Sequence, residues 1–476
     1  MRDTNAGNLE VSRRTFLKGA AATGFVTQLT PVLAEPDAFR PNIIYLHSHD
    51  SGRYLEPYGY EVPTPHIQRL ANEGTLFRRA FSVAPTCSPS RSGLLTGLYP
   101  HNNGMLGLAH RGFSLNDYKQ HLVHTLHEAG YVTVLAGIQH VAAKSETIGY
   151  DRILPIEVHG APGSHLMSAA EVSPRAVKFI DEHHASPFFL DIGYFETHRE
   201  YPDATAEDRA NFQAPPRPIP DAPETREDFA RFCASARILD DGVRQVLEAL
   251  ERNGLLENTL IISTTDHGIS FPRMKCNLTD DGWGVSLILR GPRIGKGLVQ
   301  DAMVSQIDIF PTLCDYLGIA PPQWLQGKSL LPLLAGKTET VHEEIFAEVN
   351  YHAAYEPQRA VRTERLKYIR RFGNKTTPVL PNCDDGLSKT LWLKAGWGKH
   401  QVPHESLYDL IFDPTEHDNL AGNPAYAEAL EEMRGRLNRW MTATHDPLLQ
   451  GFVAAPPGAV VNDPDGISPQ EKPRPA

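Results

Sequence analysis

The most informative segment of this chain is Thr86-Cys87-Ser88-Pro89-Ser90-Arg91-Ser92-Gly93-Leu94-Leu95-Thr96-Gly97. It predicts a short apolar helix whose start carries a cysteine, where free N–H groups and the helix dipole favour anions. Arg91 follows Cys87 by about one helical turn, so we expect its guanidinium near the Cys87 side chain. An isolated pair of this kind would more often be a buried cysteine beside a surface arginine. The whole segment instead favours a cysteine held in an anion pocket.

Strand and helix patterns alternate around this segment. Continuous apolar runs that predict buried parallel strands span residues 42–47, 132–136, 187–194 and 259–264. Helical periodicity lies between them, at residues 120–129, 172–184 and 226–253. This alternation predicts an α/β fold with a doubly wound, mostly parallel sheet. After about Gly336, segments 344–349 and 366–370 are typical of antiparallel strands and 425–442 of a final helix, which predicts a smaller C-terminal α+β subdomain.

The chain divides into four predicted parts: an export signal at 1–34, a catalytic α/β domain at 35–336, the C-terminal subdomain at 337–445 and a mostly disordered tail at 446–476. The signal contains a twin arginine, Arg13-Arg14, then a mildly apolar segment and small residues before Glu35. Its apolar part is too short to span a bilayer. We therefore expect a protein exported by the twin-arginine machinery, periplasmic or secreted, with no membrane span. The tail is rich in Pro, Gly and Asp, which predicts disorder.

Composition narrows the class of partner. The 476 residues include 57 acidic and 46 basic side chains, which gives a net charge of −11 and argues against nucleic acid as a partner. A polyanionic substrate would then need a local basic pocket. The five cysteines are too few and too scattered for a disulfide framework; they are Cys87, Cys233, Cys276, Cys314 and Cys383.

The string Cys87-x-Pro89-x-Arg91, followed by Leu95-Thr96-Gly97, resembles the signature of the type I, formylglycine-dependent sulfatases. The order of elements over 40–445 also resembles the sulfatase branch of the alkaline-phosphatase superfamily. Further similar segments are 266–268, 305–312 and 407–420. Cys-Ser-Pro-Ser-Arg, Asn103-Gly104-Met105 and Gly137-x-x-His140 are most similar to the heparan N-sulfatases, or sulfamidases. The resemblance implies a hydrolase that removes sulfate from a sulfated saccharide, with N-sulfoglucosamine as the first candidate.

The resemblance also implies a modified cysteine. In the family, a formylglycine-generating enzyme oxidises the cysteine, here Cys87, to Cα-formylglycine. The hydrated aldehyde carries two hydroxyls: one takes the sulfo group, and deprotonation of the other expels sulfate. A plain serine would remain as a stable sulfate ester, which explains the need for the aldehyde.

Polar residues follow the predicted strands and would converge on Cys87. The oxygen ligands Asp50 and Asp266 suit a hard divalent cation. The family's metal positions, usually filled by calcium, correspond here to His49, Asp50, Cys87, Asp266 and His267. His49 stands where the family normally has an aspartate, and imidazole is a poor calcium ligand. Whether His49 binds the metal or makes a structural hydrogen bond stays open.

Nitrogen donors form the expected substrate side of the site, where they suit sulfate oxygens and the leaving group. The resemblance implies that Arg91 holds formylglycine and sulfate. It also implies that His140 bonds the hydrate and serves as a base. His198 and Lys275 correspond to the pair that contacts sulfate and the departing atom, so either is a candidate acid. Many relatives carry a lysine just before the His140 position, where this chain has Ile138 and Gln139. One cationic contact is therefore missing.

Two other functions remain open from sequence. A phosphate or phosphonate ester hydrolase of the same superfamily would act on a similar tetrahedral oxyanion; a two-metal ligand set would favour it. A non-catalytic binder of sulfated glycans is the other alternative, supported by His49 and the missing lysine. The intact Cys-x-Pro-x-Arg string argues against a binder, because binding needs no modifiable cysteine.

Overall fold

The computed structural model describes residues 39–155, 167–182, 184–210 and 214–476, and residues 40–476 form one compact unit. The predicted export signal at 1–34 lies outside the described residues. Among the residues that are described, no helix combines the length and apolar character needed to cross a membrane.

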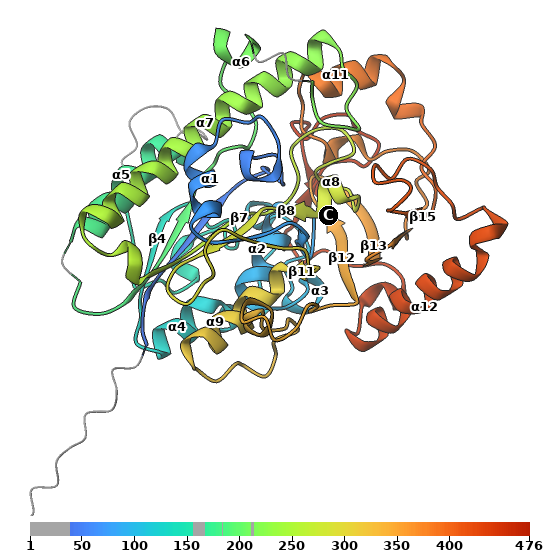
Figure 1. Cartoon of the computed structure of the whole chain (residues 1–476). Coiled ribbons are helices and arrows are strands. Elements are labelled where there is room, and N and C mark those ends of the chain that lie inside the picture. The colour runs from blue at the N-terminus through green and yellow to red at the C-terminus, as the bar shows by residue number, and fades with distance from the viewer. Residues whose placement is uncertain (1–38, 156–166, 183, 211–213) are drawn as a thin grey trace, which may run out of the picture. The chain divides into compact units, whose positions relative to one another are not determined.

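An eight-stranded, mostly parallel sheet forms the centre of this unit, which confirms the predicted fold class (Figure 1). Strand β1 lies in the middle and pairs in parallel with β6 and β7, while β9 runs antiparallel to β7 and β2. In spatial order the strands are β10 (Leu298–Gln300), β2 (Thr75–Phe77), β9 (Leu287–Arg290), β7 (Thr259–Thr265), β1 (Asn42–Ser48), β6 (Phe188–Gly193), β4 (Val132–Gly137) and β5 (Arg152–Ile153).

Helices cover both faces of the sheet (Figure 1). Side chains alternate between the faces of a strand, so Ile44 and Leu46 of β1 enter the core that contains Phe179 of α5 and Val243 of α7. This first layer comprises α1 (Pro65–Asn72), α5 (Ala169–Asp181) and α7 (Pro223–Arg252). The other face is covered by α2 (Cys87–Thr96), α4 (Leu122–Glu128) and α9 (Ile309–Leu317). The doubly wound arrangement follows from strands that are apolar on both faces.

A four-stranded antiparallel sheet forms the C-terminal region, as the sequence predicts. Its strands are β12 (Glu344–Tyr351), β13 (Tyr355–Thr363), β14 (Leu366–Arg371) and β15 (Glu405–Asp409). Helix α12 (Ala427–Ala443) buries Met433 and Leu437 against Tyr368 and Leu407 of the sheet. A smaller sheet orders β11 (Val304–Ser305), β3 (Ala80–Phe81) and β8 (Gly284–Val285). The remaining short helices are α3 (Pro100–Asn103), α6 (Ala206–Ala210), α8 (Asp280–Trp283), α10 (Leu331–Leu334) and α11 (Leu387–Lys394).

The C-terminal tail differs from the expectation of disorder. Strand β16 (Val460–Val461) pairs with β17 (Arg474–Pro475), and Asn462 is fully buried. The Asn462 amide donates to the Ala353 carbonyl at 2.7 Å, and its side-chain oxygen accepts from Arg111 at 2.6 Å. Buried apolar side chains, such as Leu448 and Val453, and hydrogen bonds of irregular backbone hold this segment. A composition rich in Pro, Gly and Asp does not reveal such contacts.

Candidate active site

Two adjacent parallel strands deliver the acidic half of the site. Ser48 of β1 lies opposite Thr265 of β7, so the residues that follow each strand leave the sheet side by side. The Asp50 amide donates to Asp266 Oδ1 at 2.9 Å. Asp50 adopts a positive φ of 50°, a left-handed conformation that a residue other than glycine adopts at some cost and that recurs at functional sites. The parallel register therefore places the two carboxylates together.

Cys87 is the first residue of α2 and faces this acidic half. Its Sγ lies 3.3 Å from His267 Nε2, and the residue is 1% exposed. Burial raises the pKa of the Cys87 thiol well above its ordinary value, with the carboxylates of Asp50 and Asp266 adding to that effect and Lys275 and Arg91 opposing it. An unmodified Cys87 would therefore stay a thiol and would be a weak nucleophile.

Ligand atoms of His49, Asp50, Cys87 and Asp266 all lie within 4.8 Å of one another, and all four residues are buried. Asp50 Oδ1 has no hydrogen-bond partner and lies 3.3 Å from His267 Nε2. His267 Nδ1 lies 2.9 Å from the Gly268 carbonyl. With the ring proton on Nδ1, that contact is a hydrogen bond and the Nε2 lone pair faces the cluster. An orphaned carboxylate oxygen beside a second carboxylate and a directed imidazole fits a divalent cation.

His49 occupies the position that the sequence left open. Its Nδ1 is 3.2 Å from Asp266 Oδ2, yet neither ring nitrogen makes a hydrogen bond of good geometry. Burial lowers the pKa of His49 well below its ordinary value, and Arg91 adds to this, which favours a neutral ring. A neutral ring with free nitrogens next to two carboxylates is available to a metal, although its contact with Asp266 is equally compatible with a structural role.

Arg91 makes its hydrogen bonds to the acidic half of the site. Its Nη2 donates to Asp266 Oδ2 at 3.0 Å and to the Ser48 carbonyl at 2.8 Å, and its Nη1 contacts His47. Burial opposes ionisation of Asp266, but His267, Arg91 and His49 outweigh it and hold the pKa of Asp266 well below its usual range. Arg91 lies in the site, as its one-turn spacing from Cys87 predicts, and its hydrogen bonds join α2 to the ends of β1 and β7.

Lys275 links the acidic half to a second group, the basic half, which consists of Lys275, His198 and the carboxylate that pairs with Lys275, Asp384. Its Nζ donates to Asp50 Oδ2 at 2.9 Å and to Asp384 Oδ2 at 2.7 Å, and lies 3.3 Å from His198 Nε2. Burial opposes the charged form of Lys275, but Asp384 and Asp50 outweigh it and raise its pKa well above the ordinary value. Asp384, just before α11, is a site residue that sequence reasoning missed. It belongs to no recognised motif and follows no strand of the central sheet.

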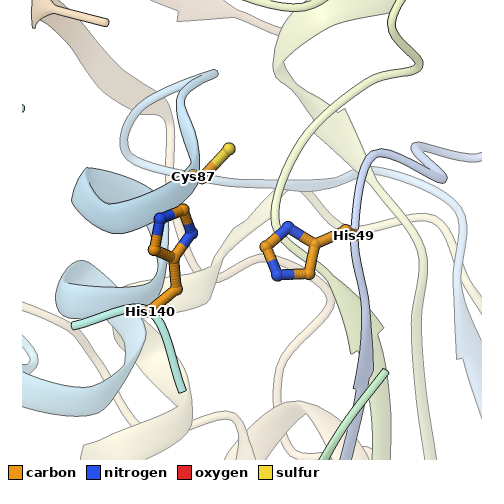
Figure 2. Close-up of side chains that lie close together, drawn as sticks. All are labelled: His49, Cys87 and His140. Carbon is orange, nitrogen blue, oxygen red and sulfur yellow. The ribbon is translucent and has the colours of Figure 1, made fainter. Parts of the chain in front are cut away.

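His140 approaches Cys87 from the end of β4. Figure 2 shows the side chains of His49, Cys87 and His140 around one space, and one ligand atom of each lies within 4.8 Å of the others. His140 has a positive φ of 54°. Its Nε2 lies 3.0 Å from Nδ1 of His110, whose ring stacks on it with centroids 5.3 Å apart. His110, on the short helix Ala109–Arg111, is a second neighbour that sequence reasoning missed.

Gln139, at one of the two positions where relatives carry a lysine, does not substitute for that lysine. Its side chain turns inward, accepts from the Ala142 amide at 2.8 Å and donates to the Ala142 carbonyl at 2.7 Å. The residue is 7% exposed. Gln139 therefore shapes the loop that carries His140 and offers no charge to a substrate.

The structure thus brings all nine predicted residues into one group, where each contacts at least one other. The carboxylates of Asp50 and Asp266 contact the cations of Lys275 and Arg91, respectively, and imidazole nitrogens lie beside the Cys87 sulfur. Such an arrangement can bind a divalent cation and a tetrahedral oxyanion next to one nucleophile position. The individual roles of these residues stay predictions.

Comparisons with known proteins agree with this geometry. Residues 41–319 match the family model described as Sulfatase, and residues 274–380 match N-sulphoglucosamine sulphohydrolase, C-terminal. The N-sulphoglucosamine sulphohydrolase of Homo sapiens is 31% identical over 91% of this chain and 94% of its own length. An ulvan-active sulfatase of Formosa agariphila is 29% identical over 86% of this chain and 76% of its own length. The solved structure of a 2-O GAG sulfatase superposes with a TM-score of 0.69, at 22% identity, over 91% of this chain and 99% of that chain.

Proposed function

The chain belongs to the sulfatase family, and we propose that this sulfatase hydrolyses the sulfamate of N-sulfoglucosamine at a non-reducing end. Family membership supports sulfate ester or sulfamate hydrolysis. The main support for this substrate is similarity to the human N-sulphoglucosamine sulphohydrolase over 91% of the chain. The match of residues 274–380 to the family model for the C-terminal part of N-sulphoglucosamine sulphohydrolases adds to it. The motif residues Asn103-Gly104-Met105 and His140 agree with this choice.

The proposal includes conversion of Cys87 to Cα-formylglycine. Its support is the complete Cys87-x-Pro89-x-Arg91 string and the burial that keeps an unmodified thiol neutral. When present, the hydrated aldehyde supplies two hydroxyls on one carbon, one for attack on sulfur and one whose deprotonation releases sulfate. Cys87→Ala should therefore abolish turnover, because alanine supplies neither hydroxyl.

One divalent ion, with calcium as the first candidate, belongs to the same proposal. Asp50 and Asp266 would hold it, with His267 and His49 as further candidate ligands, because buried donor atoms converge there and Asp50 Oδ1 lacks a hydrogen-bond partner. Such an ion polarises a sulfate oxygen and favours loss of a proton from a bound hydroxyl.

The chain's own residues would handle the protons. His140 has a buried Nδ1 without a hydrogen-bond partner, and one of its ring nitrogens lies within 4.8 Å of the Cys87 sulfur. A free imidazole nitrogen at this place suits a base. The amine of a sulfamate is a poor leaving group and needs a proton as the S–N bond breaks. Lys275 Nζ and His198 Nε2, 3.3 Å apart, are placed to share this proton, and His198 has the more exposed side chain at 26%.

The phosphate or phosphonate alternative is disfavoured by the same lysine. A second metal would need another set of oxygen and nitrogen ligands, and Asp50, His198 and Asp384 do converge. However, Lys275 Nζ lies between the carboxylates of Asp50 and Asp384, at 2.9 and 2.7 Å, and supplies the positive charge that a second cation would bring. A binder without catalysis is disfavoured because the candidate acids, the candidate base and a modifiable cysteine lie in one group.

A substrate panel tests the proposal. The protein is matured with a formylglycine-generating enzyme, and initial rates are compared on N-sulfoglucosamine, 6-O-sulfoglucosamine and an aryl sulfate, with Cys87→Ala as the blank. We expect the fastest turnover on N-sulfoglucosamine. We expect slow turnover of the aryl sulfate, because it lacks the sugar contacts that offset the cationic residue missing at 138 and 139. Fast aryl sulfate turnover without action on either sugar would contradict N-sulfoglucosamine as the substrate. It would leave the assignment to the sulfatase family unchanged.

We also propose that the protein is exported through the twin-arginine route, supported by Arg13-Arg14 and the flanking composition of 1–34. A fusion of residues 1–34 to a reporter should reach the periplasm of a bacterial host. Replacing both arginines by lysine should block this transport, and unchanged transport would contradict the proposal.

A further inference from the structure

We propose that His110 is a positioning residue that fixes the ring orientation and tautomer of His140. The effect on turnover rests on the proposed function, whereas the effect on the His140 ring does not. The proposal rests mainly on the 3.0 Å contact between His140 Nε2 and His110 Nδ1, whose rings are stacked at an interplanar angle of 12°.

His140 offers its two nitrogens to different surroundings. Nε2 contacts His110, while Nδ1 is buried and has no hydrogen-bond partner. A ligand atom of His140 lies within 4.8 Å of the Cys87 sulfur and of a His49 nitrogen. Because Nε2 contacts His110, Nδ1 is the nitrogen left for the space that His140 shares with His49 and Cys87 (Figure 2). Its state decides whether His140 presents a lone pair or an N–H there.

The hydrogen-bond balance selects one tautomer. Buried N–H groups without an acceptor are rarer than buried acceptors without a donor. If His140 carries its proton on Nε2, that proton is donated to His110 Nδ1 and the orphaned Nδ1 holds only a lone pair. The opposite tautomer would bury an N–H without an acceptor. His110 as an acceptor therefore holds His140 in the form that can accept a proton next to Cys87.

Contacts on both sides hold His110 in place. The Ala109 amide donates to the hydroxyl of Ser88, the residue after Cys87, at 3.0 Å. The Arg111 guanidinium donates to Asn462 Oδ1 at 2.6 Å and to the Ala353 carbonyl at 3.2 Å. His110 itself is solvent-exposed between these anchors. The Ala109 contact therefore ties His110 to the cysteine helix α2, and the Arg111 contact ties it to the C-terminal tail.

The test compares His110→Ala with His110→Asn. The Asn side-chain oxygen can take the place of the ring Nδ1 as an acceptor, whereas Ala has none. We expect His110→Ala to lower kcat on N-sulfoglucosamine by ~10- to 100-fold, as is typical when an orienting partner of an active-site histidine is removed, with KM little changed. His110→Asn should recover most of kcat. Added imidazole should raise the rate of His110→Ala but not of the wild type, because the exposed position is open to solvent.

A second readout does not depend on activity. In protein labelled with ¹⁵N at histidine, the His140 ring signals, assigned by their loss in His140→Ala, should report a proton on Nε2. They should shift in His110→Ala and be restored in His110→Asn. His127→Ala is the matched control, since His127 is also an exposed histidine with one side-chain partner, Asp151 at 3.0 Å; it should change neither kcat nor these signals.

The outcomes separate the two proposals. A wild type inactive on every sulfated sugar would contradict the proposed function, and the ring signals would still test His110. Unchanged His140 signals in His110→Ala would overturn the positioning role. In an active enzyme, unchanged kcat, a rise in KM alone, or equal losses in the Ala and Asn variants would also overturn it.

Discussion

The acidic half of the active site leaves the ends of two adjacent parallel strands, whereas the basic half is collected from loops far apart in the chain. His49 and Asp50 follow β1, and Asp266 and His267 follow β7, its direct neighbour. Lys275 Nζ lies 3.3 Å from His198 Nε2 and 2.7 Å from Asp384 Oδ2, although no two of these residues follow neighbouring strands. The first half is fixed by sheet register, and the second by ion pairs of Lys275, one of which reaches Asp384 in the C-terminal region.

This difference predicts how each half tolerates change. Residues at strand ends are held by backbone pairing, so a substitution there should remove chemistry and leave the fold intact. The basic half depends on its own charges for its geometry, because Lys275 is buried between two carboxylates. A substitution there should disturb position as well as charge.

Asp266→Asn should have the largest effect. Asn can still accept from the Asp50 amide, which donates to Asp266 Oδ1 at 2.9 Å, so the sheet should stay folded. The lost charge should release the divalent ion and leave Arg91 without its carboxylate partner. We expect turnover at background level and no bound metal by elemental analysis. Asp181→Asn, at an exposed ion pair of α5, should keep both. Full activity of Asp266→Asn with no bound metal would contradict the metal assignment.

Asp384→Asn should come next, with kcat lowered by ~10- to 100-fold, because Lys275 would lose a partner that orients it. Thermal unfolding should also shift to a lower temperature, since the buried Lys275 ammonium would keep Asp50 as its one carboxylate partner among the described contacts. The neighbouring Asp385→Asn is the control; Asp385 accepts from Lys389 and Ser468, away from the group around Cys87. Equal behaviour of the two variants would show that Asp384 has no special place in the site.

His49→Asp should have a smaller and opposite effect on the acidic half. An added carboxylate among hard-cation ligands should tighten calcium by about tenfold, or ~1.4 kcal/mol. Calorimetric titration of metal-stripped protein with calcium measures this change. The same affinity before and after substitution would place residue 49 outside the metal's ligands.

Gly112→Ala should give the smallest change and tests how the tail holds His110. Gly112 has a φ of +95°, and an added Cβ would lie 2.9 Å from Ala459 Cα. Gly59 is the matched control: it also ends a short 3₁₀ helix, at a φ of +89°, but nothing lies within 4 Å of its added Cβ. Both should lose about 1–2 kcal/mol of unfolding free energy from the backbone conformation. Only Gly112→Ala should lose more and also lower kcat; identical losses would contradict the packed tail.

The comparison also explains which parts of the molecule the sequence could predict. Parallel strands deliver their C-terminal residues to one edge, so the apolar runs at 42–47 and 259–264 locate His49, Asp50, Asp266 and His267 without knowledge of side-chain contacts. The cysteine helix α2 was also predictable from local pattern, because the Cys87-x-Pro89-x-Arg91 motif lies at the start of an apolar helical segment. These features depend on local pattern and on one general rule of sheet geometry.

Asp384, His110 and the tail lay beyond such rules. Asp384 follows no strand of the central sheet, and its contact with Lys275 spans 109 residues of chain. His110 lies on a three-residue helix positioned by Ser88 and Asn462 from two other regions. The tail's richness in Pro, Gly and Asp predicts disorder, whereas long-range hydrogen bonds and buried side chains such as Val453 hold it in the structure. Long-range polar contacts of irregular segments leave no periodic signal in a sequence.

The most direct test of the central claim relates sulfate release to the state of Cys87. Preparations made with and without a formylglycine-generating enzyme differ in the converted fraction of the tryptic peptide 80–91, which mass spectrometry quantifies. The rate of sulfate release from N-sulfoglucosamine is then measured on each preparation. We predict a rate proportional to the converted fraction that extrapolates to zero for unmodified cysteine. Equal rates from fully converted and wholly unconverted protein would contradict the account.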